Sequence, residues 1–179
     1  TREGYEFVGW SETNPDKIKE YDSGSLYTKN ENLKLYAIWR KTVTITFYKN
    51  GAASITPKGG SASTASSLTQ TCYMYNAETN CSITSPTISA SSATPTVLGW
   101  GTASSSTSNS WSVNTAKSFS SNASYYAVTK KDAVTYTATF GANNATLVDT
   151  GNTDSATKDS CTIAATYNGT AQATSCQVH

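Results

Sequence analysis

Apolar and hydroxyl-bearing residues alternate along much of this chain, which is the pattern of half-buried β-strands. Residues 42–47 (TVTITF) alternate strictly, and residues 135–140 (TYTATF) repeat the pattern. Alternation, or a run of β-branched and aromatic residues, predicts strands at 33–39, 42–48, 72–76, 96–100, 123–129, 134–140 and 161–166. The chain is therefore expected to be mainly β.

Only two segments have features of a helix. Asn14-Pro15-Asp16 offers residues preferred at helix caps and first positions, which predicts a one-turn helix ending near Tyr21. Residues 61–68 could form a second short helix or a loop. We expect little helix overall, with a β-grasp-like α+β module as the alternative fold.

Two parts of the chain match each other at a constant offset. Gly9-Trp10 is echoed by Gly99-Trp100, and residues 35–41 (LYAIWRK) by 125–131 (YYAVTKK), both 90 positions later. Residues 42–47 match 135–140 at an offset of 93, and each of two Cys pairs follows such a run. The order predicts tandem small modules.

The offsets divide the chain into three parts. Residues 1–41 are the C-terminal half of one repeat, 42–131 a complete repeat with the Cys72/Cys81 loop, and 132–179 the N-terminal half of a further repeat. A chain that starts and stops inside repeats is expected to be a piece of a longer array.

The composition is polar but weakly charged. Ser and Thr supply 56 of 179 residues, charged residues only 14%, and the formal net charge is +1. Aromatic residues reach 11%, which favours a folded chain over a disordered Ser/Thr linker. The small net charge argues against nucleic acid as a partner, and no apolar run is long enough for a membrane span. A surface solvated by hydroxyls is commoner in extracellular proteins.

The four cysteines form two local pairs, Cys72/Cys81 and Cys161/Cys176. Neither pair has the spacing of metal ligands, and the lone His179 lies at the end of the sequence, so zinc is not expected. Two local disulfides in an oxidising compartment fit the pairs best. Four unpaired buried thiols are the alternative.

Part of the sequence resembles a known bacterial repeat. Residues 4–10 (GYEFVGW), 21–24 (YDSG) and 33–39 (LKLYAIW), with residues 43–51 (VTITFYKNG) as the opening strand and turn, resemble the Listeria–Bacteroides repeat, the family of the internalin B-repeat. The second copy departs from this pattern at Pro95, Val97 and Thr129, and the Cys pairs are not part of it. The resemblance implies a β-grasp-like module in a surface-anchored protein, often linked to adhesion.

The recurring aromatic residues are interpreted as the core of the repeat, because a large ring buries much area in a small module. They are Phe7, Trp10, Tyr36, Trp39, Phe47, Trp100, Tyr126 and Phe140. Trp111 lies in a very polar neighbourhood, so stacking on a ligand such as a sugar is an alternative for it. Tyr21 lies 90 positions before Trp111, and an aromatic residue at both repeat positions favours a core role for Trp111.

The sequence contains no strong motif for catalysis, metal binding or modification. A Ser–His–Asp arrangement would need His179 to fold back onto the core, and the carboxylates cluster in residues 1–41, where they resemble a solvated face. Residues 149–154 (DTGNTD) lack the ligands of an EF-hand and are interpreted as an Asx-rich turn. Matches to the N-glycosylation pattern at Asn80, Asn122, Asn144 and Asn168 are expected by chance at this Ser/Thr content. We expect no enzyme and no cofactor.

The function expected from these observations is structural. The chain is interpreted as a non-catalytic stalk or adhesin module of a bacterial cell-surface protein. Its partners would be adjacent repeats of the same chain and, beyond them, a host or bacterial surface glycan or protein. A carbohydrate-binding module with Trp111 in its platform and a fibre-forming module that exchanges strands are the alternatives.

Overall fold

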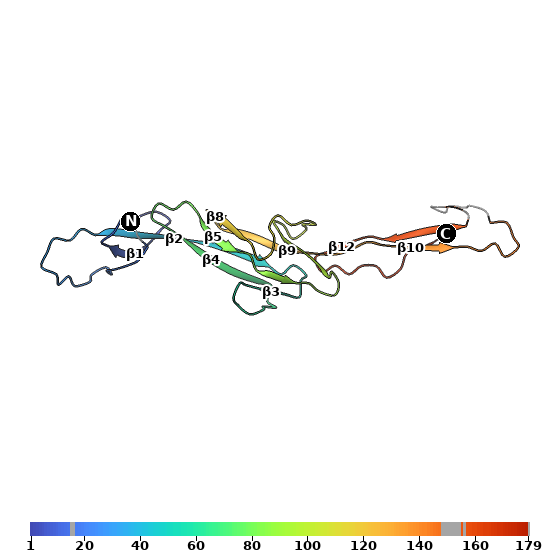
Figure 1. Ribbon diagram of the computed structural model, residues 1–179, viewed down its shortest axis with the longest axis horizontal. Coiled ribbons are helices and arrows are strands. Elements are labelled where there is room, and N and C mark those ends of the chain that lie inside the picture. Colours follow the sequence, from blue (N-terminus) through green and yellow to red (C-terminus); the bar gives the residue numbers. More distant parts are fainter. Residues whose placement is uncertain (15–16, 148–154, 156, 179) are drawn as a thin grey trace.

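The protein is an elongated all-β chain (Figure 1). The computed structural model describes residues 1–14, 17–147, 155 and 157–178. The strands are β1 (Glu6–Ser11), β2 (Tyr36–Tyr48), β3 (Ser54–Thr56), β4 (Ser67–Tyr75), β5 (Cys81–Thr84), β6 (Thr87–Ser89), β7 (Thr96–Gly101), β8 (Ala116–Phe119), β9 (Ala123–Lys131), β10 (Val134–Thr139), β11 (Lys158–Ile163) and β12 (Thr166–Tyr167). The expectation of a mainly β chain is confirmed.

A six-stranded sheet built around β2 and β9 forms the backbone of the molecule. The first part of β2 pairs antiparallel with β1, and the second part pairs antiparallel with β4 and parallel with β9. Strand β9 also pairs with β7 and, at its end, with β12. Three two-stranded sheets make up the rest of the described strands: β3–β6, β5–β8 and β10–β11.

Strand β2 joins two segments that the sequence predicted as separate strands. It runs through Arg40 and Lys41 without a break, because neither residue is a turn former. The buried face changes there, since Ile38 lies on one face of the strand and Val43, Ile45 and Phe47 lie on the other. The expected boundary between residues 41 and 42 therefore lies inside a 13-residue strand. At the corresponding place after β9, Asp132 and Ala133 separate it from β10.

The β1–β2 and β7–β9 hairpins have the same register. Gly9 lies opposite Ile38 and Gly99 opposite Val128, and every other aligned pair of the two hairpins is also displaced by 90 positions. Both ladders have an irregularity just before the glycine. A bulge of this kind bends the strand and re-aims the side chains that follow it.

No helix forms in the described residues, and this corrects two predictions. Residues 61–66 are a loop whose Ser63 bridges to Ile55, and Ser67 already begins β4. Residues 17–21 are not helical, and Tyr21 forms an isolated bridge with Trp10, while Pro15 and Asp16 lie outside the described residues. Residues 61–66 are rich in Ser and Thr, whose side chains compete for backbone hydrogen bonds, and neither segment has a helical period of apolar residues to bury. The α+β alternative is wrong in this respect.

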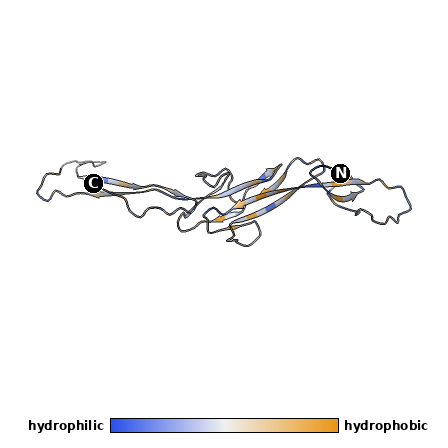
Figure 2. Cartoon of the chain, turned by 180° about the vertical axis from the view of Figure 1, so that it is seen from behind, coloured by the Kyte–Doolittle hydropathy of each residue, from blue (hydrophilic) through white to orange (hydrophobic). Residues whose placement is uncertain are grey.

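The contiguous core lies within residues 42–131. Its largest fully buried side chains include Trp100 and Phe47, with Ile45 and Val43 beside them on β2. Figure 2 shows hydrophobic segments on the strands of residues 42–131, hereafter the middle unit, and on the β1–β2 hairpin. The β10–β11 hairpin is mostly pale. Among the described residues there is no helix that could cross a membrane.

Candidate functional site

The loop that follows each Gly-Trp pair returns to the strand it left. Trp100 donates its backbone N–H to the carbonyl of Trp111 at 2.8 Å, and Trp111 donates back to Trp100 at 3.1 Å. Trp10 and Tyr21 exchange the same two bonds at 2.9 and 3.1 Å. The sequence had aligned Tyr21 with Trp111, and the structure gives the two residues the same backbone partners.

Glycine is required where these loops approach the strand. Gly99 has φ +134°, and a Cβ placed there would lie 2.8 Å from the carbonyl oxygen of Trp111. Gly9 has φ +152°, and its Cβ would lie 2.7 Å from the carbonyl oxygen of Tyr21. Only glycine tolerates both the dihedral and the contact. The recurring Gly-Trp motif thus has a local geometric cause.

The eight aromatic residues interpreted as core are buried to different degrees. Phe47 and Trp100 are fully buried, with ring centroids 4.8 Å apart in an edge-to-face contact. Trp100 also donates its indole N–H to the carbonyl of Pro86 at 3.0 Å. The other six are half-buried: Phe7, Trp10, Tyr36, Trp39, Tyr126 and Phe140. In the first hairpin Phe7 packs edge-on against both Trp10 and Trp39.

Trp111 lies in the core of the middle part of the molecule. Its side chain is 6% exposed and contacts the rings of Phe47, Phe119 and Tyr125 at centroid distances of 5.7, 5.4 and 5.1 Å. Its indole nitrogen is buried and has no hydrogen-bond partner among the described residues. A ring enclosed in this way presents no free face for stacking a sugar, so its placement agrees with the core role that Tyr21 suggested.

A lysine beside this aromatic cluster was not anticipated. Lys117 donates to the hydroxyl of Tyr125 at 2.9 Å, and its ammonium lies 5.0 Å from the centroid of the Tyr125 ring and 5.6 Å from that of Trp111. Cations at this distance from aromatic faces are attracted by the ring quadrupole. The sequence does set Lys117 apart, because it and Glu78 are the two charged residues between Lys58 and Lys130.

Both predicted disulfides are confirmed. Cys72 on β4 is bonded to Cys81 at the start of β5, and Cys161 on β11 to Cys176 in the C-terminal segment. The Cα atoms are 5.8 Å apart in each pair, and no cysteine is free. Cys72 and Cys81 also pack against the core. Disulfides persist in oxidising compartments, so the two bonds indicate such an environment.

The middle part of the molecule meets residues 132–179 at two Asn-Gly turns. Asn50 donates its side-chain amide to the carbonyls of Ser104 and Ala127, both at 2.9 Å. Asn168 donates to the carbonyls of Ser104 and Ser106 at 3.0 and 2.9 Å, so both amides hold one loop.

The two turns also touch each other directly. A Cβ on Gly51 would lie 2.1 Å from the carbonyl oxygen of Asn168. Below the turns, the buried hydroxyls of Thr94 and Thr129 are 2.7 Å apart, and Thr94 accepts the N–H of Gly169 at 3.0 Å. The sequence analysis did not anticipate this contact.

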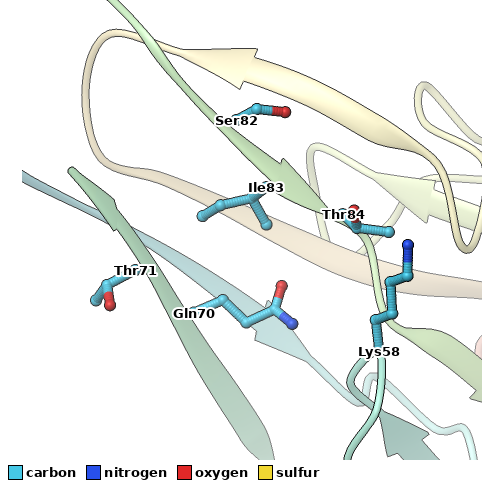
Figure 3. Close-up of a pocket in the computed structure, with 6 residues that line it drawn as sticks. All are labelled: Lys58, Gln70, Thr71, Ser82, Ile83 and Thr84. Atoms are coloured by element: carbon cyan, nitrogen blue, oxygen red, sulfur yellow. The ribbon is translucent and has the colours of Figure 1, made fainter. Parts of the chain in front are cut away.

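A polar hollow of about 380 Å³ lies between β4 and β5 (Figure 3). It is lined by Lys58, Gln70, Thr71, Ser82, Ile83 and Thr84. The side-chain oxygen of Gln70 is buried there without a hydrogen-bond partner among the described residues. The lining holds one cation and no carboxylate, so it lacks the pair of titratable groups that acid–base chemistry requires.

The carboxylates serve local contacts. The Tyr21 hydroxyl, and then Lys29, hold the pKa of Glu12 below its ordinary value, and the same contact raises the pKa of Tyr21. The Lys17 ammonium and the backbone N–H of Tyr75 lower the pKa of Glu78. Within the described part of the chain no three His, Cys, Asp or Glu side chains are grouped to hold a metal ion. The predicted Asx-rich turn at 149–154 lies outside the described residues.

Comparison with protein-family models, with curated proteins and with solved structures finds no match for this chain.

Proposed function

We propose that this chain is a load-bearing segment of an extracellular tandem-repeat protein, with a repeat of about 90 residues. The observation that carries the proposal is the agreement between the two Gly-Trp hairpins. They share register, bulge position, glycine geometry and return loop at a constant offset of 90 positions. Agreement at every level of backbone geometry is what copies of one module would show.

The surface location rests on two further observations. The disulfides require an oxidising environment, and the surface is solvated mainly by hydroxyl groups. The resemblance of residues 4–10, 21–24 and 33–39 to the Listeria–Bacteroides repeat points to a bacterial cell surface. A stalk or adhesin segment that is not itself an enzyme fits both observations.

The strand order within residues 42–131 suits a module under tension. The first strand of this unit, the second part of β2, lies parallel to its last strand, β9, with residues 45–48 opposite 123–126. Tension that enters at residue 42 and leaves at residue 131 therefore pulls the two strands past each other. In this shear geometry all the hydrogen bonds between them bear load together, whereas peeling would break them one after another.

The junction with the following segment supports the same role. Asn168 donates two hydrogen bonds, of 3.0 and 2.9 Å, to the loop carbonyls of Ser104 and Ser106, and β12 pairs with the end of β9. Neighbouring units joined by such contacts keep a fixed relative orientation, as a stalk requires. No observation favours carbohydrate binding over this role, because Trp111 is enclosed in the core.

Single-molecule force spectroscopy tests the proposal. A single chain held at residues 1 and 179 is expected to show one high-force event, the opening of residues 42–131 by shear. In a control, the same protein is held at residues 53 and 179. The β2–β9 pair is then peeled from one end and should open at a several-fold lower force.

Equal opening forces in the two geometries would contradict the proposal. So would a middle unit that opens at the same force as the end hairpins, because such a chain could not act as a load-bearing segment.

A further inference from the structure

The two end segments carry nearly all of the exposed apolar surface. Among the described residues, the large hydrophobic side chains that remain exposed are Ile18, Leu26 and Tyr27 in residues 1–41, Val134, Tyr136 and Val178 in residues 132–179, and only Tyr73 in the middle unit. Exposed apolar residues gathered in particular segments indicate an interaction surface.

Residues 132–179 expose a row of side chains whose counterparts in the middle unit are buried. Tyr136 and Ala138 on β10, and Phe140 directly after it, align with Val43, Ile45 and Phe47 of β2 at the offset of 93. The three β2 residues are 0% exposed, whereas Tyr136 is 56% exposed. A hollow of about 480 Å³ lies over this row, bounded by Tyr136, Ala138, Cys176 and Val178 among others.

In the middle unit this row is covered by three aromatic residues of the following half. Trp100, Trp111 and Tyr125 pack on Phe47 at centroid distances of 4.8, 5.7 and 6.2 Å. Their counterparts 90 positions earlier are Trp10, Tyr21 and Leu35, all half-buried. One end of the molecule thus holds the uncovered row, and the other end holds the residues that would cover it.

The backbone hydrogen-bonding edges of the two end segments are complementary in the same way as their side chains. Residues 123–126 pair with β2, and the side chain of Asn122 accepts the N–H of Thr44 at 2.9 Å. At the corresponding positions, residues 33–35 belong to no strand and are preceded by Asn32. Strand β10 has β11 on one edge and no partner among the described strands on the other. An unpaired edge is a template for another chain.

We propose that residues 132–179 are completed by a segment built like residues 1–41, and that a second copy of this chain can supply that segment, which gives a composite unit built like residues 42–131. This inference rests on the proposed equivalence of the units. The two segments lie at opposite ends of an elongated molecule (Figure 1), so one chain cannot close on itself. A head-to-tail contact between copies is open-ended and produces filaments.

The middle unit also predicts the register of the contact. Because Ile45 lies opposite Ala123 and Thr46 opposite Ser124, Ala138 of one copy should lie opposite Leu33 of the other, and Thr139 opposite Lys34. Neighbouring strands lie about 4.8 Å apart, which is within the Cα separation of a disulfide. Cysteines placed at the paired positions should therefore cross-link.

Sedimentation velocity of the full chain over a range of concentrations tests the association. We expect oligomers that grow with concentration, and a blue shift of tryptophan fluorescence as Trp10 becomes covered. Tyr136→Asp should weaken association at least about tenfold, because it places a charge in the composite core. Thr69→Asp, at an exposed position of β4 in the middle unit, lies in neither docking segment and should associate like the parent. Circular dichroism melting shows that both variants fold.

Cysteine trapping tests the register. A mixture of Lys34→Cys and Thr139→Cys chains should form a cross-linked pair, whereas Lys34→Cys with Thr135→Cys should not. A chain that stays monomeric at all concentrations, or that cross-links equally in both mixtures, overturns the inference. Neither result bears on the force measurement, which is made on a single chain, so the proposed function can fail or survive separately.

Discussion

At the scale of single residues, backbone freedom at two glycines decides how the Gly-Trp hairpins are built. Gly9 and Gly99 combine a positive φ with a carbonyl oxygen less than 3 Å from the position of a Cβ. The motif was visible in the sequence as a repeated pair of letters. Its cause, the close approach of the return loop, depends on a contact with residues 12 positions along the chain and is visible only in the structure.

Replacing Gly99 by alanine should therefore destabilise the middle unit. The positive φ and the clash with the Trp111 carbonyl together should lower the free energy of unfolding by about 3 kcal/mol. Urea denaturation followed by tryptophan fluorescence measures the change. Gly141→Ala is the control, because no atom lies within 4 Å of its Cβ position, and it should have little effect. Similar losses for both variants would contradict this account.

At the scale of elements, the chain uses one long strand to connect two neighbouring parts and one covalent link to close a short loop. Strand β2 is paired along its length by β1 and then by β4, so it is a shared element and not a linker. The Cys72–Cys81 bond ties β4 to β5 beside the core. The longer strands could be predicted from the alternation of apolar and polar residues. The short strands β3, β5, β6 and β8 lacked a pattern strong enough to predict them.

Removing the Cys72–Cys81 bond should destabilise the middle unit more than removing the other bond. Closing a loop of this length restricts the unfolded chain by about 2.5 kcal/mol, so the Cys72→Ala/Cys81→Ala variant should lose that much stability. The Cys161→Ala/Cys176→Ala variant should leave the same fluorescence transition unchanged, because that bond lies outside the core. Urea denaturation of both variants gives the comparison. A transition shifted equally by the two changes would argue against a separate core in residues 42–131.

At the scale of the whole molecule, the junction between the middle unit and the C-terminal segment determines whether the elongated shape is rigid. The side chain of Asn168 donates to the carbonyls of Ser104 and Ser106 and accepts the N–H of Thr129. The β9–β12 pairing and the bond from the Gly169 N–H to Thr94 also join the two parts. The junction is therefore a point at which one side chain can alter the behaviour of the entire chain.

The Asn168→Ala variant should loosen the molecule without unfolding it. Loss of three hydrogen bonds should let residues 132–179 reorient independently, which small-angle scattering would detect as a broader distribution of maximum dimensions. Asn143→Ala is a matched control, because Asn143 also has a positive φ (44°, against 55° for Asn168) but makes no junction contact. Identical scattering from the two variants would show that the junction is held by other contacts.

The sequence by itself determined the β class, the principal strands, the Cys pairing and the correspondence between the two Gly-Trp segments. The first three depend on period-two alternation and on residues close together in the chain, and the fourth is a match between two stretches of sequence, so each can be read without knowing which residues are in contact. Only the tertiary structure decided the parallel pairing of β2 with β9, the burial of Trp111, the position of Lys117 and the meeting of the two Asn-Gly turns. Each of these joins residues distant in the sequence, and their proximity follows from the packing of the whole unit, which no local pattern encodes.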